Sequence, residues 1–326
     1  MIDGWLAVAA VGVGVVVGLT GMGGGALMTP LLVFFFGVPP LAAVSSDLVA
    51  SAVMKPVGGL VHLRHGTVNL ALVRWLCVGS VPAAFSGVLI AKALGDSAQV
   101  DQFIQKALGA ALLVAAAGLV ARAYMRLTER ARRRDLGLSG EPASLPPPAI
   151  AIRPVPTVMV GVLGGVVVGL TSVGSGSLII ISLLALYPTL RAAQLVGTDL
   201  VQAVPLVMAA AIGHLLFGDF QFHVAAALVL GSVPGVWAGA MLSSRAPGGL
   251  IRRALAIVLA VSGLKLLGAP NTLSALAVVA LVLVGPLLWM AVRRRHGFPA
   301  VSHRSTALLS TWMRRRPTPD RPSGRR

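Results

Sequence analysis

The chain has 326 residues, of which 56% are hydrophobic and 11% are charged. Soluble proteins carry about 25% charged residues, so this composition excludes an ordinary soluble domain and indicates an integral membrane protein. The formal net charge is +17, and seven of the basic residues lie in 122–153 and ten in 293–326. Basic segments beside apolar spans are typical of cytoplasmic loops. They predict topology and contact with anionic lipids, and they argue against nucleic-acid binding because no folded basic module is visible.

The apolar runs predict α-helices, because they approach the ~20 residues that cross a bilayer and do not alternate as β-barrel strands do. The first run begins without a basic segment, so we interpret it as a membrane element and not as a cleaved signal peptide. Cys77 is the single cysteine, which excludes an intrachain disulfide and a cysteine metal site. In chain order the expected helical elements are 4–19, 23–36, 42–62, 70–91, 103–124, 156–171, 177–187, 192–215, 223–243, 250–268 and 272–292.

The two halves of the chain repeat each other. SDLV at 46–49 matches TDLV at 198–201, and GSVP at 79–82 recurs at 231–234, both at a shift of 152 residues. His62 matches His214 at the same shift, and several matches in order at one offset indicate an internal duplication. The expected organisation is a first transmembrane repeat at 1–124, a linker at 125–153, a second repeat at 154–268, an extra helix at 269–292 and a basic, disordered tail at 293–326. The linker is Arg-rich and Pro-rich and is too polar to fold alone.

The charges also predict an orientation. The linker at 125–153 and Arg293–Arg295 should be cytoplasmic. Three full spans follow the first helical hairpin, an odd number, so the second half should lie upside down relative to the first. Inverted repeats are typical of secondary transporters, whose substrate sites lie near the midplane. We therefore predict an all-α, polytopic membrane protein of the plasma membrane with two inverted-topology repeats, each opening with a glycine-broken helical hairpin.

The breaks in these hairpins are glycine-rich: GLTGMGGGALMTP at 18–30 and GLTSVGSGSLIII at 169–181. Each flanking helix covers about 24 Å or less, which is shorter than a ~30 Å hydrocarbon core. Non-helical backbone at that depth must be buried or line a wet cavity. A helix N-terminus after Gly23, Gly24 and Gly25 would direct N–H groups at such a cavity. The second cluster offers the same groups and adds hydroxyls, through Gly174, Ser175, Gly176 and Ser177. The alternative is close helix packing through small residues.

Ionisable residues inside apolar spans are hypotheses for function. Asp47 and Asp199 are repeat mates that could bind a proton or cap a broken helix; the alternative is that each accepts backbone N–H bonds from a glycine loop. Lys55 lies about two helical turns after Asp47 and could hold an anion or pair with an aspartate. His62 and His214 are candidates for gating or proton relay, or are simply interfacial. A weaker indication places Gln194 and Gln202 along the pore.

The pattern GLTGMGGGALMTPLLV, followed by SSDLV and repeated in the second half, resembles the sulfite exporter TauE/SafE (TSUP) family. The resemblance covers roughly 5–268, although Ile181 stands where the first copy has Pro30. It implies a permease for sulfite, sulfonates or related anions. From the broken-helix argument, the candidate substrate-binding residues of the first cluster are Gly21 and Gly23–Gly25.

We expect a secondary transporter for small anions that needs no cofactor, with the substrate held between the clusters and Lys55 balancing its charge. A passive anion pore is the alternative. A membrane enzyme is disfavoured, since acids, histidines and nucleophiles are too few.

Overall fold

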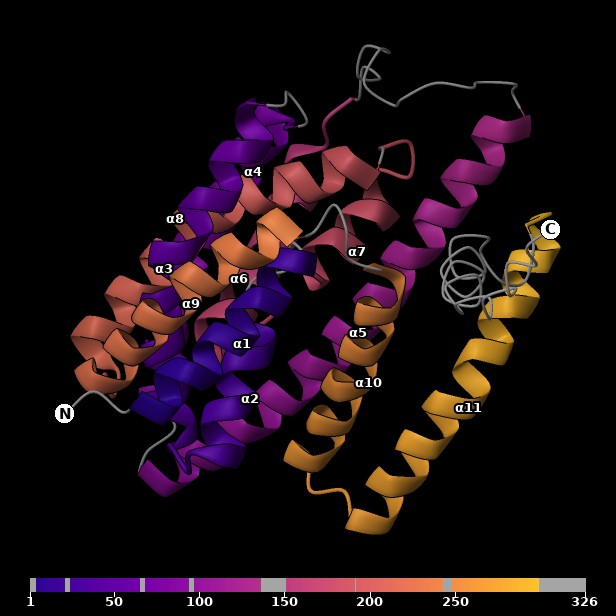
Figure 1. The fold of residues 1–326 in the computed structure, drawn as a ribbon. Helices are drawn as coiled ribbons and strands as arrows, with labels where there is room; N and C mark the ends of the chain where they lie inside the picture. Colours follow the sequence, from indigo (N-terminus) through magenta and orange to yellow (C-terminus); the bar gives the residue numbers. More distant parts are fainter. Residues whose placement is uncertain are drawn as a thin grey trace, which may run out of the picture.

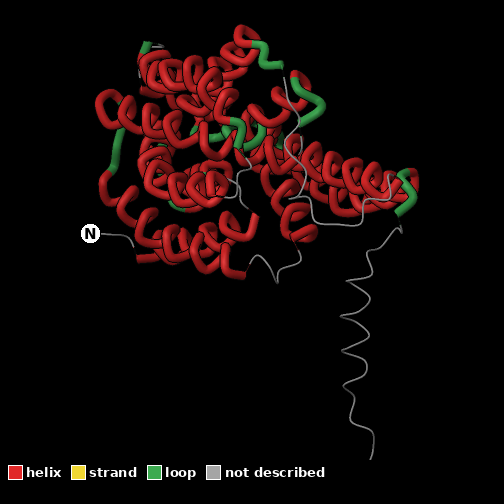
Figure 2. Tube along the Cα trace, turned by 90° about the horizontal axis from the view of Figure 1, so that it is seen from above, coloured by secondary structure: helices red, strands yellow, loops and turns green. Residues whose placement is uncertain are grey.

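The computed structural model describes residues 4–20, 24–64, 68–93, 97–135, 151–190, 192–242 and 248–298. Within these ranges the chain folds into helices and contains no strand (Figure 2). The all-α fold class predicted from the sequence is therefore confirmed. The helices in chain order are α1 (Gly4–Thr20), α2 (Gly25–Phe35), α3 (Pro40–Arg64), α4 (Leu70–Lys92), α5 (Ser97–Asp135), α6 (Pro154–Thr171), α7 (Leu178–Leu186), α8 (Ala192–Phe217), α9 (Phe222–Leu242), α10 (Gly248–Leu266) and α11 (Asn271–Arg295).

These helices match the expected elements to within a few residues, with α5 as the exception. It was expected at 103–124, but it continues to Asp135 and so includes the first part of the segment assigned to the linker. The helix continues because that part is rich in Arg, Leu, Glu and Ala, which are good helix formers. Leu127 and Ala131, one turn apart, are also buried. The rest of the predicted linker up to residue 150, and the tail from residue 299, lie outside the described residues.

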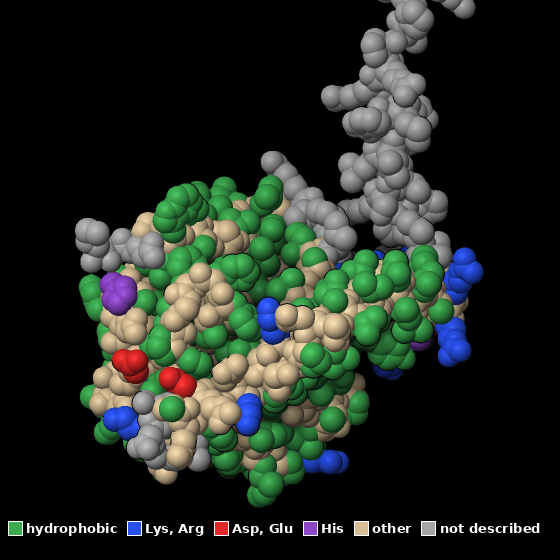
Figure 3. Space-filling model, turned by 90° about the horizontal axis from the view of Figure 1, so that it is seen from below, with side chains coloured by type: hydrophobic (Ala, Val, Ile, Leu, Met, Phe, Trp, Pro, Cys, Tyr) green, Lys and Arg blue, Asp and Glu red, His purple; other side chains and the backbone are tan. Residues whose placement is uncertain are grey.

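The described helices can cross a bilayer several times. Six are long and apolar enough to do so by length and composition: 70–92, 98–132, 154–171, 194–217, 222–239 and 271–295. The first two helices are apolar but shorter, with 17 residues in α1 and 11 in α2. Hydrophobic side chains cover much of the face seen from below in Figure 3, and charged ones are few. The chain is thus a multi-pass membrane protein, as its composition predicted.

Two helix pairs, α4 with α6 and α1 with α9, approach so closely that only glycine fits between them (Figure 1). A Cβ atom added to Gly165 of α6 would lie 2.9 Å from Cα of Ser80 in α4. A Cβ atom added to Gly14 of α1 would lie 2.9 Å from Cα of Ser232 in α9. Close approach through small residues is how membrane helices gain van der Waals contact without a hydrophobic driving force.

The same packing occurs twice, once for each half. Gly14 corresponds to Gly165, and Ser232 corresponds to Ser80, so exchanging the halves turns one contact into the other. Both pairs run parallel, since successive glycines of one helix meet successively later residues of the other.

Corresponding helices also pack against each other, and they do so antiparallel. The beginning of α3 meets the end of α8, where Ser45 lies beside His214. Gly59, near the end of α3, faces Val204 of α8. The other pair is α5 and α10, which meet at Gly109 and Gly263. Matching helices of the two halves therefore pack against each other in opposite directions.

The last helix, α11, stands at the edge of the molecule (Figure 1). Its main neighbour is α10, and none of its most apolar stretch is buried inside the protein. It occupies the place of the extra helix predicted at 269–292. A helix that is apolar all round and unburied by protein fits a lipid-facing position.

Candidate anion site between the two glycine-rich loops

The break after α6 contains two residues with positive φ. Ser172 has φ 59° and Gly174 has φ 124°, and the turn of residues 175–177 leads into α7. Positive φ is sterically costly for most L-residues, which explains the glycine at 174. In the first half α1 ends at Thr20 and α2 begins at Gly25. Both breaks lie where the sequence predicted them.

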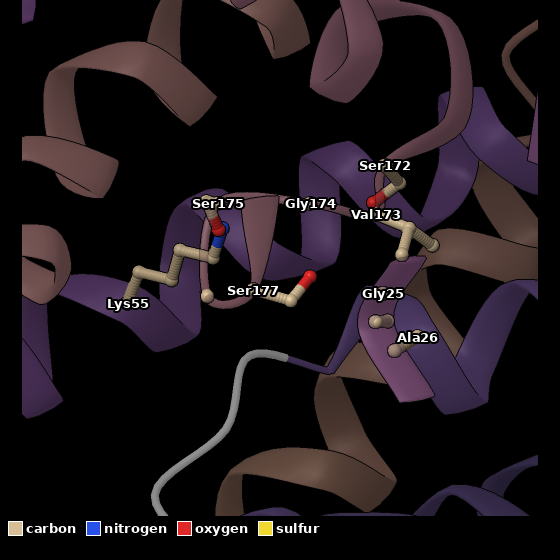
Figure 4. A pocket seen from close by; sticks show the side chains of 10 residues that line it. Gly25, Ala26, Lys55, Ser172, Val173, Gly174, Ser175 and Ser177 are labelled. Atoms are coloured by element: carbon tan, nitrogen blue, oxygen red, sulfur yellow. The ribbon is translucent and has the colours of Figure 1, made fainter. Parts of the chain in front are cut away.

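The start of α2 meets the second glycine-rich loop. Gly25 packs against Ser172, and a Cβ atom at Gly25 would lie 2.7 Å from Oγ of Ser172. On the other side α5 packs closely against the second loop: a Cβ atom added to Gly118 of α5 would lie 2.7 Å from Cβ of Ser177. A small pocket remains between them (Figure 4), lined by Gly25, Ala26, Lys55, Ala115, Ser172, Val173, Gly174, Ser175, Gly176 and Ser177.

Most of the predicted substrate residues therefore come together. Gly25, Lys55 and the four residues from Gly174 to Ser177 line the pocket. Gly24 is buried next to the pocket, and a Cβ atom added to it would lie 3.1 Å from Cε of Met54. Gly21 and Gly23 lie outside the described residues.

Lys55 supplies the positive charge of the pocket. Its side chain is 8% exposed, and Nζ donates a hydrogen bond to Oγ of Ser175 at 2.9 Å (Figure 4). Among the described residues no carboxylate lies within 4.0 Å of it, so the direct pairing with an aspartate is not seen there. Asp47 and Asp199 act on it electrostatically from a greater distance. A buried ammonium without a contacting anion is costly, which makes Lys55 a group that would gain from a bound anion.

Asp47 joins the two halves. Its Oδ2 accepts hydrogen bonds from Thr29 Oγ1 of α2 at 2.9 Å and from Ser172 Oγ of the second loop at 2.6 Å. Its Oδ1 is buried and has no hydrogen-bond partner within the described part of the protein. The sequence-based alternative was a cap on backbone N–H groups, whereas the donors here are two hydroxyls. Hydrogen bonds to an ionised acceptor are the stronger kind.

Asp199 lies behind the second loop, with Arg122 of α5 beside it. A Cβ atom at Gly176 would lie 3.3 Å from Nη2 of Arg122 and 3.9 Å from Oδ2 of Asp199. Oδ1 of Asp199 and both amide atoms of Gln202 are buried without a hydrogen-bond partner in the described residues. Buried polar atoms are nearly always satisfied, so such a cluster is unusual and fits a place that binds water or a ligand.

His214 is enclosed by protein on all sides, which leaves both sequence-based interpretations of it as predictions. It is fully buried, with Nδ1 at 2.8 Å from Ser45 Oγ and Nε2 at 2.6 Å from the Gly169 carbonyl oxygen. Because a carbonyl only accepts, Nε2 carries a proton and donates to it. His214 thereby connects α3, α6 and α8, away from the pocket. Its mate His62 lies in α3, and its side chain is outside the described residues.

Sequence reasoning missed Thr29, Ser172 and Arg122. Ser172 lies inside the second glycine-rich motif, so its presence near the site was predictable, but its bond to Asp47 was not. Arg122 stands in an apolar stretch of α5, as Lys55 does in α3, and this placement is the signal that could have marked it. It was counted with the topology-determining basic residues instead.

The arrangement can hold a small anion. Its groups are one ammonium, three serine hydroxyls and the first residues of α2, a helix start that carries positive partial charge. Glycines at 25, 174 and 176 let a ligand approach the backbone.

Comparisons with known proteins identify a family and two similar membrane proteins. The family model for "Sulfite exporter TauE/SafE" matches residues 6–266. "Probable membrane transporter protein YjnA" of Bacillus subtilis (strain 168) is 38% identical over 256 residues, which is 78% of this chain and 96% of that protein. "Probable membrane transporter protein YdhB" of the same strain is 25% identical over 254 residues, with the same coverage of 78% and 96%. No solved structure matches the chain. The matched region ends before α11.

Proposed function

We propose that this chain, which belongs to the sulfite exporter TauE/SafE family, is a secondary transporter that carries sulfite or organosulfur anions such as sulfonates across the plasma membrane. Membership of that family and the relatives named as membrane transporters make it a membrane transporter. The anionic substrate, the alternating-access mechanism and the cytoplasmic position of the linker and tail are the parts that we propose.

The observation that carries the proposal is the pocket around Lys55. The ammonium is buried, contacts a serine hydroxyl and has no carboxylate within 4.0 Å among the described residues. An oxyanion in this pocket would accept hydrogen bonds from Lys55, Ser175 and Ser177, and its negative charge would offset the buried cation. A cationic substrate would face the opposite electrostatics.

Alternating access is supported by the position of the pocket. It lies where the start of α2, from one half, meets the second glycine-rich loop, from the other, and Asp47 reaches across to Ser172. Matching helices α3 and α8 pack antiparallel, as inverted repeats would. Rocking one half against the other would then open the pocket to one side of the membrane and afterwards to the other, while Lys55 keeps its place in α3.

The test is uptake of radiolabelled sulfite into proteoliposomes, with and without an imposed pH gradient. We expect saturable uptake that is stimulated by unlabelled sulfite on the opposite side, since a carrier exchanges substrate. Lys55→Ala should abolish it, and Lys55→Arg should restore part of it. Lys92→Ala is the matched control, because Lys92 is exposed at the end of α4. Sulfite uptake that is unchanged in Lys55→Ala would refute the proposed site.

Asp47→Asn and Asp199→Asn separate a coupled carrier from a passive anion pore. A carrier that uses either carboxylate for a proton should lose its dependence on the pH gradient in the corresponding variant. A passive pore should conduct sulfite without saturation and without stimulation from the opposite side, in wild type and variants alike, and that result would overturn the carrier mechanism.

A further inference from the structure

A second basic pocket lies beside the first, and the proposed function does not use it. We call it the arginine pocket, and its lining residues are Thr20, Leu119, Arg122, Ala123, Arg126 and Arg252. Arg122 and Arg126 are one turn apart on α5, and Arg252 comes from α10. The end of α1, just before the first glycine-rich loop, forms its remaining wall.

The charges around this pocket repel one another. Arg126 experiences the positive charges of Arg252 and Arg130, with Glu129 as the opposing acid. Arg252 in turn experiences those of Arg122 and Arg130. No ion pair joins any of these groups to a carboxylate within 4.0 Å in the described parts of the chain. Nε of Arg122 is buried and has no hydrogen-bond partner there either.

Guanidinium groups gathered without contacting counterions are chemically suited to bind an oxyanion. The planar guanidinium presents paired N–H donors that match the oxygens of sulfite, sulfonate, sulfate or phosphate. A topology signal alone requires basic residues in the loop, but it does not require three of them to converge on one partly enclosed space from two different helices.

Arg122 links the arginine pocket to the pocket around Lys55. It lines the arginine pocket and also reaches the pocket around Lys55 from behind, where its Nη2 would lie 3.3 Å from a Cβ atom added to Gly176. Asp199 interacts electrostatically with both Arg122 and Lys55. Charged groups therefore follow one another from Lys55 through Asp199 and Arg122 to the mouth formed by α5 and α10.

We propose that the arginine pocket is a second anion subsite, in which Arg122, Arg126 and Arg252 hold the oxyanion group of a ligand at the cytoplasmic end of the path to Lys55. This inference rests on the proposed function for the role of the subsite in transport. Its cytoplasmic placement follows from α5, whose C-terminal end leads into the basic linker. The ligand chemistry is an oxyanion, either the free substrate or the phosphate of an anionic lipid.

The first experiment counts the sites. Equilibrium binding of radiolabelled sulfite is measured on the purified chain in uncharged detergent, under nitrogen. We expect two sulfite ions per wild-type chain. The double variant Arg126→Gln/Arg252→Gln should lose one of them, and Lys55→Gln should lose the other. Single Arg→Gln changes should weaken binding at the second subsite by about 10- to 100-fold, as expected for a lost hydrogen bond to a charged group.

Arg253→Gln is the matched control. Arg253 is adjacent in sequence to Arg252, but its guanidinium lies over the ring of Trp289, with Cζ 6.0 Å from the ring centroid, and does not line the pocket. It should keep both sites. Monodisperse elution of each variant from a sizing column confirms that it is folded, and Arg126→Lys, which retains the charge, should retain part of the binding.

The second experiment separates the two sources of the oxyanion. Sulfite binding is repeated in nanodiscs of phosphatidylcholine with and without phosphatidylglycerol. Binding at the arginine pocket that persists in both supports a subsite for free substrate. Its displacement by phosphatidylglycerol alone assigns the pocket to a lipid phosphate and overturns its role in transport.

The outcomes also distinguish this inference from the proposed function. Suppose that the wild-type chain binds a single sulfite ion. Loss of this ion in the double arginine variant, with binding kept in Lys55→Gln, would refute the Lys55 site and support the arginine pocket. One sulfite that is lost only in Lys55→Gln would do the reverse. Two sulfite ions that survive in the double arginine variant would overturn the second subsite altogether.

Discussion

Gly25→Ala tests the idea that the start of α2 and the second glycine-rich loop must touch for the pocket to form. The added Cβ would lie 2.7 Å from Oγ of Ser172 and 2.9 Å from its carbonyl carbon, whereas ordinary contact begins near 3.4 Å. The two segments would have to part by roughly half an ångström or more, because the obstacle is backbone and not the end of a flexible side chain. Overpacking of this kind costs about 1–3 kcal/mol.

The expected effect on transport is larger than that on stability. The same shift would pull Ser172 away from Asp47, to which it donates a 2.6 Å hydrogen bond, and would reshape the wall of the pocket. Displacing a binding group by about 1 Å can reduce the rate of a positioned process about 100-fold. We therefore expect sulfite uptake to fall by about 10- to 100-fold, while the helical circular dichroism signal is retained.

The assay is sulfite uptake into proteoliposomes, with the amount of inserted protein measured in each preparation. Gly12→Ala is the matched control, since it adds the same methyl group to a helix of the first hairpin with no atom within 4 Å. It should transport as wild type does. Equal uptake by Gly25→Ala and Gly12→Ala would show that contact between the two segments is unimportant, and the reasoning about the pocket would fail.

Three other changes address the packing and the buried hydrogen bonds. Thr29→Val removes one of the two hydrogen-bond donors to Asp47, which should lower the free energy of unfolding by about 1.5–3 kcal/mol. The thermal midpoint in detergent should fall, and an unchanged midpoint would mean that Thr29 does not hold the carboxylate of Asp47. Gly165→Ala should separate α4 from α6 and lower the midpoint by an amount that corresponds to about 1–3 kcal/mol, since the added carbon would lie 2.9 Å from the Cβ atom of Ala83; a midpoint at or above that of wild type would contradict the close packing. His214→Phe removes the hydrogen bond that joins α8 to Ser45 of α3 and leaves the Gly169 carbonyl buried and unpaired, at a cost of about 1–3 kcal/mol. Crosslinking between cysteines placed in α3 and α8 should then become less efficient, and unchanged crosslinking would show that His214 does not hold these two helices together.

The sequence by itself determined where the helices lie. A residue inside a bilayer must satisfy its backbone polar groups within its own segment, so an apolar run of sufficient length has few alternatives to a helix. The breaks at the two glycine-rich motifs followed from the same rule, because the flanking runs are too short to span. The internal duplication was also visible in the sequence, and it predicted that α3 and α8, and their aspartates, would be counterparts.

The tertiary structure alone decided which groups meet. Asp47 and Ser172 are 125 residues apart, and nothing in the local pattern indicates that a carboxylate of one half accepts from a hydroxyl of the other. The burial of His214 and the convergence of Arg122 with Arg252 are likewise results of how whole helices dock. Hydropathy is a local property that fixes the helices one at a time. The choice of partners depends on close approach at a few glycines, such as Gly14 and Gly165, and such contacts form only when distant segments are already in place.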